Sequence, residues 1–221
     1  MTARVPRQER GEQRRDALLA AAVEVVETGG PAAFSARNVA VRGKLPLAAV
    51  SYYYPRLDDL LGAAIAVVVG GWVQHGAGVV RALDGSTSTG TAAAAAAITD
   101  ALLPGGDRTA IRHRYEHLLA AASYPVAAAV VADLRPRLQE LIDAILAYTG
   151  TTSAIGADGL LALLDGAAVG AVSEGSAGGD PVLDGDLRDR VAATVSTALT
   201  DGRPAQNQPI QSANNRPEIR S

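Results

Sequence analysis

Apolar residues recur every three or four positions through almost the whole chain, and clusters of glycine and proline separate the segments that carry this spacing. From Gln8 to Thr28, for example, leucine, alanine and valine keep the spacing until Gly29-Gly30-Pro31 ends it. Such spacing gathers apolar side chains on one face of a helix, whereas half-buried strands need strict alternation. Signals for strands are almost missing, so the sequence predicts an all-α fold.

The same spacing predicts nine helices, and a glycine or a proline ends each of them. The first four are expected from Gln8 to Thr28, from Ala36 to Arg42, from Leu47 to Tyr53 and from Leu57 to about Leu83. The other five are expected from Thr91 to Leu103, from Asp107 to Ala122, from Pro125 to Tyr148 with a kink at Pro136, from Asp158 to about Glu174 and from about Leu183 to Leu199.

Composition places the chain among globular proteins. Its 221 residues are 48% hydrophobic and 19% charged, and apolar runs stay well below the ~20 residues of a membrane-spanning helix. We therefore expect no contact with a membrane. The lack of cysteine excludes disulfides, thiolate zinc sites and cysteine nucleophiles. No apolar segment of the secretory type follows Met1, so we expect a cytoplasmic protein.

The charge is unevenly distributed along the chain. Residues 1–56 hold nine Lys or Arg against five Asp or Glu, a net charge of +4, and the remainder carries −7. A basic segment on an acidic body suggests that the first quarter binds a polyanion such as DNA. A solvated charged face would explain the same charges.

Two short helices are expected in this basic segment, with one long helix before them and another after them. Ser35 stands at the N-cap position of the first short helix and Gly43 follows its end, while Pro46 and Pro55 bound the second. Two short helices with a tight connection form the layout of a helix-turn-helix, in which the second helix enters the major groove of DNA.

The residues of this segment also carry a family resemblance. Residues 35–40 read SARNVA, residues 45–56 read LPLAAVSYYYPR, and residues 58–61 read DDLL. From about Leu18 to Leu61, without a gap, the chain resembles the TetR family of transcriptional regulators. The resemblance implies a basic arm and helix-turn-helix DNA-binding domain over residues 1–56 and a helical ligand-binding and dimerisation domain over residues 57–200. Residues 201–221, rich in proline and polar residues, are expected to be a disordered tail.

The resemblance also implies roles for individual residues in DNA binding. Leu47, Ala48 and Ala49 would face the bases, Tyr53 would contact a phosphate, and Arg37 would reach a base from the preceding helix. Tyr54 matches a core aromatic. The residues expected at the DNA are Ser35, Arg37, Leu47, Ala48, Ala49, Ser51, Tyr52, Tyr53 and Arg56.

Several positions depart from the family pattern. Lys44 replaces the usual turn glycine, Pro46 the usual Ser or Thr cap, Ser51 a common tyrosine and Leu57 a common phosphate-binding lysine. The recognition surface is therefore rather apolar and suits thymine methyl groups. These departures leave open an alternative, a TetR-like protein that binds small molecules and has weakened DNA binding.

The resemblance further implies a homodimer on a palindromic operator, a repressor role, and release by a small apolar effector. The last two helices would supply the dimer interface, for which we expect Leu160, Leu164, Ala167, Ala171, Val191 and Val195. The middle helices would enclose the effector, and their polar or aromatic residues are the candidates for its contacts, although ordinary packing also explains each of them. The candidates are Trp72, His75, His113, His117 and Tyr124.

One motif points to another class of protein. Residues 113–117, which read HRYEH, fit the H-x-x-E-H pattern of zinc peptidases, in which two histidines hold zinc and a glutamate activates water. A third zinc ligand is not evident in the sequence, and no other catalytic pattern stands out. We therefore expect no enzyme, no metal and no cofactor, and keep a zinc hydrolase as the third hypothesis.

Overall fold

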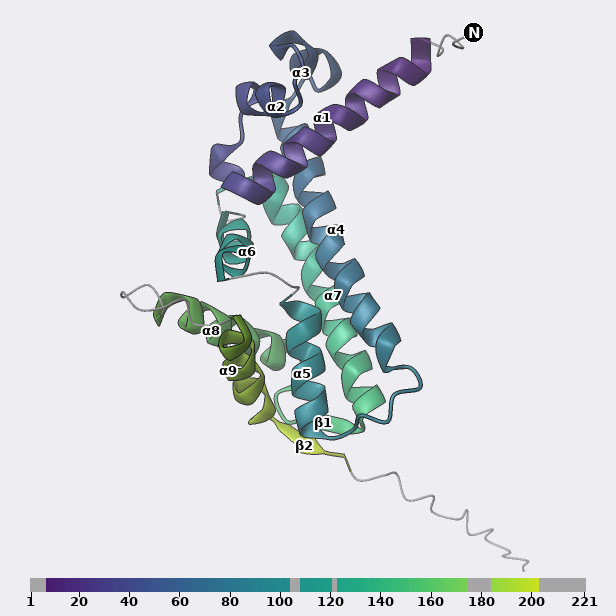
Figure 1. Ribbon diagram of the computed structural model, residues 1–221, viewed down its shortest axis with the longest axis vertical. Coiled ribbons are helices and arrows are strands. Elements are labelled where there is room, and N and C mark those ends of the chain that lie inside the picture. The colour runs from purple at the N-terminus through teal and green to yellow at the C-terminus, as the bar shows by residue number, and fades with distance from the viewer. Residues whose placement is uncertain (1–6, 104–107, 121–122, 175–183, 203–221) are drawn as a thin grey trace, which may run out of the picture.

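The computed structural model describes residues 7–103, 108–120, 123–174 and 184–202. Over these ranges the chain forms nine α-helices, one short 3-10 helix and two short strands, so the expected all-α class is confirmed. The molecule is elongated, with three helices gathered at one end and the others in a longer bundle (Figure 1).

The helices at the upper end in Figure 1 are those of the expected helix-turn-helix. They are α1 (Arg7–Gly29), α2 (Ala36–Arg42) and α3 (Leu47–Tyr53), with a 3-10 turn, η1 (Pro31–Ala33), between the first two. The expected bounds of α2 and α3 are correct, and those of α1 differ by one residue at each end. Glycine and proline located these ends because few other residues stop a helix so sharply.

The long helix α4 (Leu57–Leu83) leaves this end and runs beside α7 (Pro125–Thr149) along the length of the molecule (Figure 1). The helix α5 (Thr91–Leu102) packs against both. The three approach closely at Gly76, where a Cβ atom would lie 3.2 Å from the carbonyl oxygen of Ala101 and 2.5 Å from Leu141 Cδ1. A larger residue at this position would force the helices apart.

The remaining helices lie on one side of this layer. They are α6 (Arg108–Ala120), α8 (Gly156–Glu174) and α9 (Asp184–Ser196). The helices α8 and α9 pack on each other, and α9 also covers α5. In Figure 1, α6 lies between α8 and the end of α1, and it contacts both.

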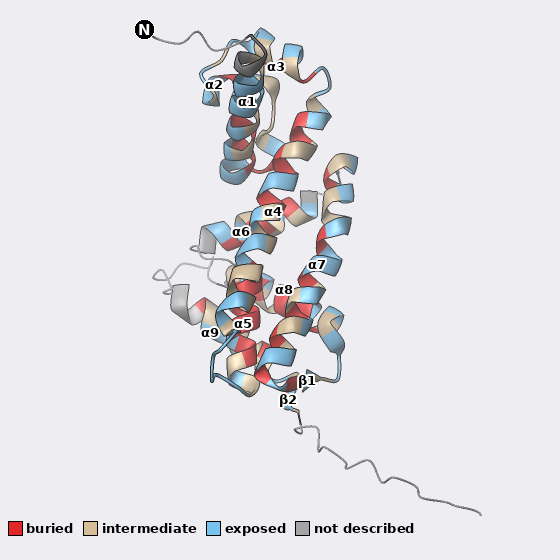
Figure 2. Cartoon of the chain, turned by 90° about the vertical axis from the view of Figure 1, so that its right-hand side faces the viewer, coloured by how far each residue is buried: buried red, intermediate tan, exposed pale blue. Residues whose placement is uncertain are grey.

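One hydrophobic core runs through both regions of the molecule. Leu18 of α1, Leu60 of α4 and Leu164 of α8 all belong to it and are fully buried. Figure 2 shows the buried residues as red bands on the helix faces that turn toward one another. The division at residue 56 remains a prediction, because the core continues from α1 into α4.

The sequence interpretation missed a small antiparallel sheet. Its strands are β1 (Thr151–Ser153) and β2 (Leu199–Asp201), and Thr152 pairs with Thr200. Consequently the expectation of a helix up to Leu199 is wrong, because α9 ends at Ser196. Three residues are too few for an alternating pattern to emerge, and the two strands lie far apart in the sequence.

Three smaller expectations also need comment. Pro136 lies within α7, which continues past it. Asp201 belongs to β2 and so is no part of a tail, while residues 203–221 lie outside the described residues. Two helices, Leu57–Leu83 and Gly156–Ser173, are long and apolar enough to cross a membrane by length and composition alone. Both pack against other helices of the bundle, which buries 28% of each apolar window.

Candidate functional site

The first short helix of the helix-turn-helix begins with a side-chain cap. Ser35 has extended backbone angles, and its hydroxyl oxygen accepts a hydrogen bond from the backbone N–H of Asn38 at 3.1 Å. The Asn38 side chain in turn donates to the carbonyl oxygen of Ala33 at 2.7 Å. These bonds satisfy a free N–H group of the helix and fix the direction in which the chain enters it.

The turn between α2 and α3 is formed by Lys44. Among the described residues it is the one non-glycine residue with a positive φ, at 52°. The next residue, Leu45, donates its backbone N–H to the carbonyl oxygen of Ala40 at 2.9 Å and so closes the end of α2. The tight turn is therefore retained, although the lysine lacks the conformational freedom of the glycine that the family prefers here.

The helix α3 has one inner and one outer face. Val50 is buried, and Tyr54, which follows the helix, is 7% exposed, as a core aromatic should be. The outer face carries Leu47 and Tyr52, which are 55% and 74% exposed. It adjoins a hollow of about 690 Å³ between the start of α1 and α3, whose lining residues are Gly11, Arg14, Leu45, Pro46, Ala48, Ala49, Tyr52 and Tyr53.

Basic side chains also lie at this end of the molecule. Arg37 and Lys44 are exposed, while Arg42 lies 3.7 Å from Glu24 and Arg56 lies 3.6 Å from Asp59. Ion pairs between exposed groups are weak, so a phosphate could compete for Arg42 or Arg56. The structure thus brings the expected DNA-binding residues to one end of the molecule.

A second group of functional candidates lies where α6 meets α4 and α8. Arg114 is 5% exposed, and its guanidinium carbon lies 4.5 Å from the centre of the Trp72 ring. The neighbouring Tyr115 donates its hydroxyl to Asp165 Oδ1 at 3.0 Å. Trp72 was expected at this site. Sequence reasoning missed Arg114 and Asp165 as members, because charged residues normally face water.

Burial shapes the acid–base properties of this group. It lowers the pKa of the Arg114 guanidinium below its ordinary value. Burial also raises the pKa of the Asp165 carboxyl, and this rise is partly offset by the Tyr115 hydrogen bond and by the charge of Arg114. These opposing shifts have one cause, since a charge of either sign is less stable away from water.

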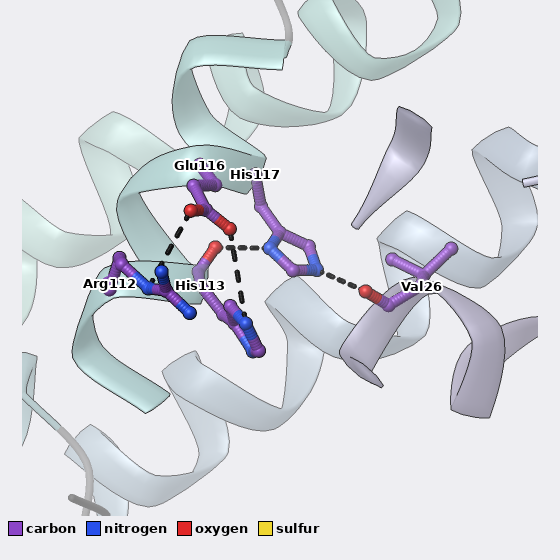
Figure 3. Close-up of polar contacts among 5 residues, drawn as sticks. All are labelled: Val26, Arg112, His113, Glu116 and His117. Carbon is purple, nitrogen blue, oxygen red and sulfur yellow. Dashed lines mark hydrogen bonds and ion pairs between the residues drawn. The ribbon is translucent and has the colours of Figure 1, made fainter. Parts of the chain in front are cut away.

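The two histidines of residues 113–117 do not form a metal site in this geometry (Figure 3). His117 is buried, and its ring nitrogens face the carbonyl oxygens of His113 and Val26, the latter at 2.7 Å. His113 lies 4.0 Å from Glu116, whose other oxygen lies 3.7 Å from Arg112. Within the described residues, no group of three His, Asp or Glu residues is placed to hold a metal ion.

The other expected effector residues are more scattered. The His75 ring lies 2.9 Å from the carbonyl oxygen of Asp100 and borders a separate hollow of about 590 Å³ between α4 and α5. Tyr124 is half-buried and directly precedes α7. The structure therefore joins Trp72 and His117, whose ring centres are 6.4 Å apart, and places His75 at a different hollow.

The C-terminal half of the chain is similar to a known protein family. A family model described as "Tetracyclin repressor-like, C-terminal domain" matches residues 87–201, which is more than half of the chain. This protein belongs to the TetR family. A search of curated proteins by sequence found no match.

Solved structures of similar proteins agree with this assignment. The multidrug binding protein EbrR, complexed with proflavin, is 27% identical, with a TM-score of 0.57 over 82% of this chain and 99% of that one. A TetR family member from Streptomyces coelicolor A3 is 29% identical, with a TM-score of 0.55 over 82% and 98%. A transcriptional regulator from Rhodococcus sp. Rha1, at 20% identity, shares the fold with a TM-score of 0.64 over 83% and 95%.

As a TetR regulator, the protein combines a DNA-binding helix-turn-helix with a helical ligand-binding domain, and such regulators are generally not enzymes. The residues expected at its dimer interface stay a prediction. Most of them are buried in the protomer's own core, namely Leu160, Leu164, Ala171, Val191 and Val195. Ala167 is half-buried, and with Ala171 it borders a surface hollow of about 210 Å³ between α8 and α9.

Proposed function

We propose that this TetR regulator is a cytoplasmic, homodimeric repressor that leaves its operator when a small molecule binds between α4, α6 and α8. The observation that carries the proposal is the position of α6. On one side His117 contacts the carbonyl oxygen of Val26, near the end of α1, at 2.7 Å. On the other side Arg114 and Tyr115 contact Trp72 and Asp165 in the body.

This position explains how ligand binding could change DNA binding. A ligand that displaces α6 would move a helix that contacts α1, and α1 packs directly on α2 and α4. A ligand favours one arrangement only if it binds that arrangement more tightly. Release follows if the favoured arrangement places the two recognition helices of the dimer at the wrong separation for the operator.

A similar protein of known structure supports a ligand-binding role. EbrR has been crystallised with proflavin and with ethidium, at 27% and 28% identity to this chain. We infer that the DNA side of the function uses the outer face of α3 together with Arg37, Tyr53 and Arg56. Leu47 and the alanines that follow it would contact thymine methyl groups, because this part of the face is apolar.

Selection of binding sites from a random DNA pool at two salt concentrations tests the proposal. A DNA-binding repressor recovers an inverted repeat, and its affinity falls steeply with salt because bound phosphates release counterions. Weak binding without sequence preference would favour the alternative, a TetR-like ligand-binding protein with weakened DNA binding. Two observations support this alternative. The exposed start of α3 is apolar, and Lys44 occupies the turn before it.

A further inference from the structure

Arg114 is the most unusual side chain in the body of the protein. It is 5% exposed, and among the described residues none of its three guanidinium nitrogens has a hydrogen-bond partner. Arginine stays positively charged at neutral pH and offers five N–H donors. A buried charge whose donors are all unsatisfied is costly, and native structures rarely keep one without a partner that binds it.

The surroundings leave the guanidinium available to such a partner. The guanidinium carbon lies 4.5 Å from the centre of the Trp72 ring, and the N–H groups make no hydrogen bond, so they remain able to donate. Asp165 is the nearby acid, but one of its oxygens already accepts the Tyr115 hydroxyl at 3.0 Å. Trp72, Tyr115 and Asp165, with which Arg114 interacts, are themselves only partly buried.

We propose that Arg114 binds the carboxylate of a small, otherwise apolar organic acid, and that such acids are the effector class of this regulator. A carboxylate has two oxygens in a plane and matches the planar fork of the guanidinium with two parallel hydrogen bonds. The apolar remainder of the acid would lie against Trp72 and the neighbouring aliphatic side chains. The link to regulation rests on the function proposed above, whereas the binding chemistry does not.

An organic acid differs in charge from ethidium, which has been crystallised with the similar protein EbrR. Ethidium carries a positive charge, and in this chain a buried guanidinium already occupies the face of Trp72. Two like charges in a dry site repel each other strongly, so ethidium should bind here weakly or not at all. The preference for an anion is therefore a property of this chain and can be measured without DNA.

Calorimetric titration of the full chain tests the proposal directly. The probes are benzoate, octanoate and 2-naphthoate, each paired with its neutral primary amide, and ethidium serves as the cationic probe. We expect at least one acid to bind about tenfold more tightly than its amide, as charge-assisted hydrogen bonds predict. Equal binding of acid and amide in all three pairs, the failure of all three acids to bind, or tighter binding of ethidium overturns the proposal.

Two variants on the same helix sharpen this test. Arg114→Met should abolish the preference for the acid and leave the unliganded protein at least as stable, because an unsatisfied buried charge is removed. Arg112→Met alters an exposed arginine two residues away and should keep the preference. Strong destabilisation or failure to fold of Arg114→Met would show that Arg114 is already paired and would refute the premise.

Adding selected operator DNA separates the two proposals. If an acid binds through Arg114 but does not release DNA, the binding of acids by Arg114 stands, and their role as effectors is refuted. If release occurs only with a neutral or cationic compound, the regulation stands and the proposed ligand class is wrong.

Discussion

Lys44 shows how a single residue can keep a motif at a local cost. Its φ of 52° lies in the left-handed region, which costs a side-chain-bearing residue roughly 1 kcal/mol relative to glycine. The hydrogen bonds that close α2 hold it there. The turn therefore keeps its geometry without the glycine that is typical of the family, and the strain at Lys44 is the cost in stability.

Replacement of Lys44 can separate strain from charge. We expect Lys44→Gly to raise the free energy of unfolding by about 0.5–1 kcal/mol, because glycine adopts the same φ without strain. Lys44→Ala removes the same charge but keeps the strain, so it should give no such gain. Urea denaturation measures both variants, and equal stabilisation by the two would contradict the role assigned to φ.

Arg37 is the residue whose loss should change sequence preference. It is exposed on α2, the helix before α3, and an arginine can bind guanine with two hydrogen bonds. Arg37→Ala should weaken binding to a selected duplex about tenfold and broaden the range of sequences bound. Arg81→Ala, at the far end of α4, is the matched control and should bind as the parent protein does. Unchanged affinity of Arg37→Ala, measured by fluorescence anisotropy at fixed salt, would remove Arg37 from the interface.

Asp165 should make stability depend on pH in a defined direction. Its carboxyl has a raised pKa in the folded protein, so the folded state holds the proton more tightly than the unfolded state. Its contribution is complete below the unfolded pKa of about 4 and is lost as the pH rises through the folded value. The stability of the parent protein relative to Asp165→Asn should therefore fall over this range, by up to about 1.4 kcal/mol per pH unit. A relative stability that rises with pH would show the opposite shift.

Residue roles could be predicted from sequence where they depend on near neighbours. Ser35 was assigned as a helix cap from the residues that follow it, and the structure confirms the cap. Arg114 could not be found in the same way. Its contacts come from Trp72 and Asp165, which lie far away in the chain, and no local pattern marks an arginine as buried.

At the scale of elements, the helices were predictable and the sheet was not. Glycine and proline mark most helix ends, so the expected bounds of α2 and α3 agree with the structure. The pairing of β1 with β2 depends on how α8 and α9 return the chain to the end of α7. That return is a property of the packed molecule and leaves little trace in three-residue segments.

Gly76 is the position where element packing is most sensitive to size. A side chain there would meet the carbonyl oxygen of Ala101 and the Leu141 side chain. We expect Gly76→Val to lower the free energy of unfolding by about 1–3 kcal/mol, as overpacking does. Gly71→Val, on the same helix with nothing within 4 Å of its Cβ, controls for helix propensity and should cost far less. Equal losses in thermal denaturation would place the effect in propensity rather than in packing.

At the scale of the whole molecule, we expect dimerisation to depend on the outer faces of α8 and α9. Val169 is 45% exposed on α8, and Ala167, Gly170 and Thr194 border a surface hollow between α8 and α9. A charge at the centre of an apolar interface is poorly tolerated. Val169→Glu should therefore raise the dimer dissociation constant at least about tenfold, whereas Val67→Glu, exposed on α4, should not. Sedimentation equilibrium compares the two, and an unchanged dimer in Val169→Glu would place the interface elsewhere.

We infer that two copies of this TetR regulator read DNA together through α3. Sedimentation velocity of the protein with a labelled duplex, taken from the random-pool selection, tests this inference. We expect two protomers on each duplex, and a recovered inverted repeat whose half-sites are centred about 34–36 Å apart. A single protomer on a duplex without two-fold symmetry would contradict it.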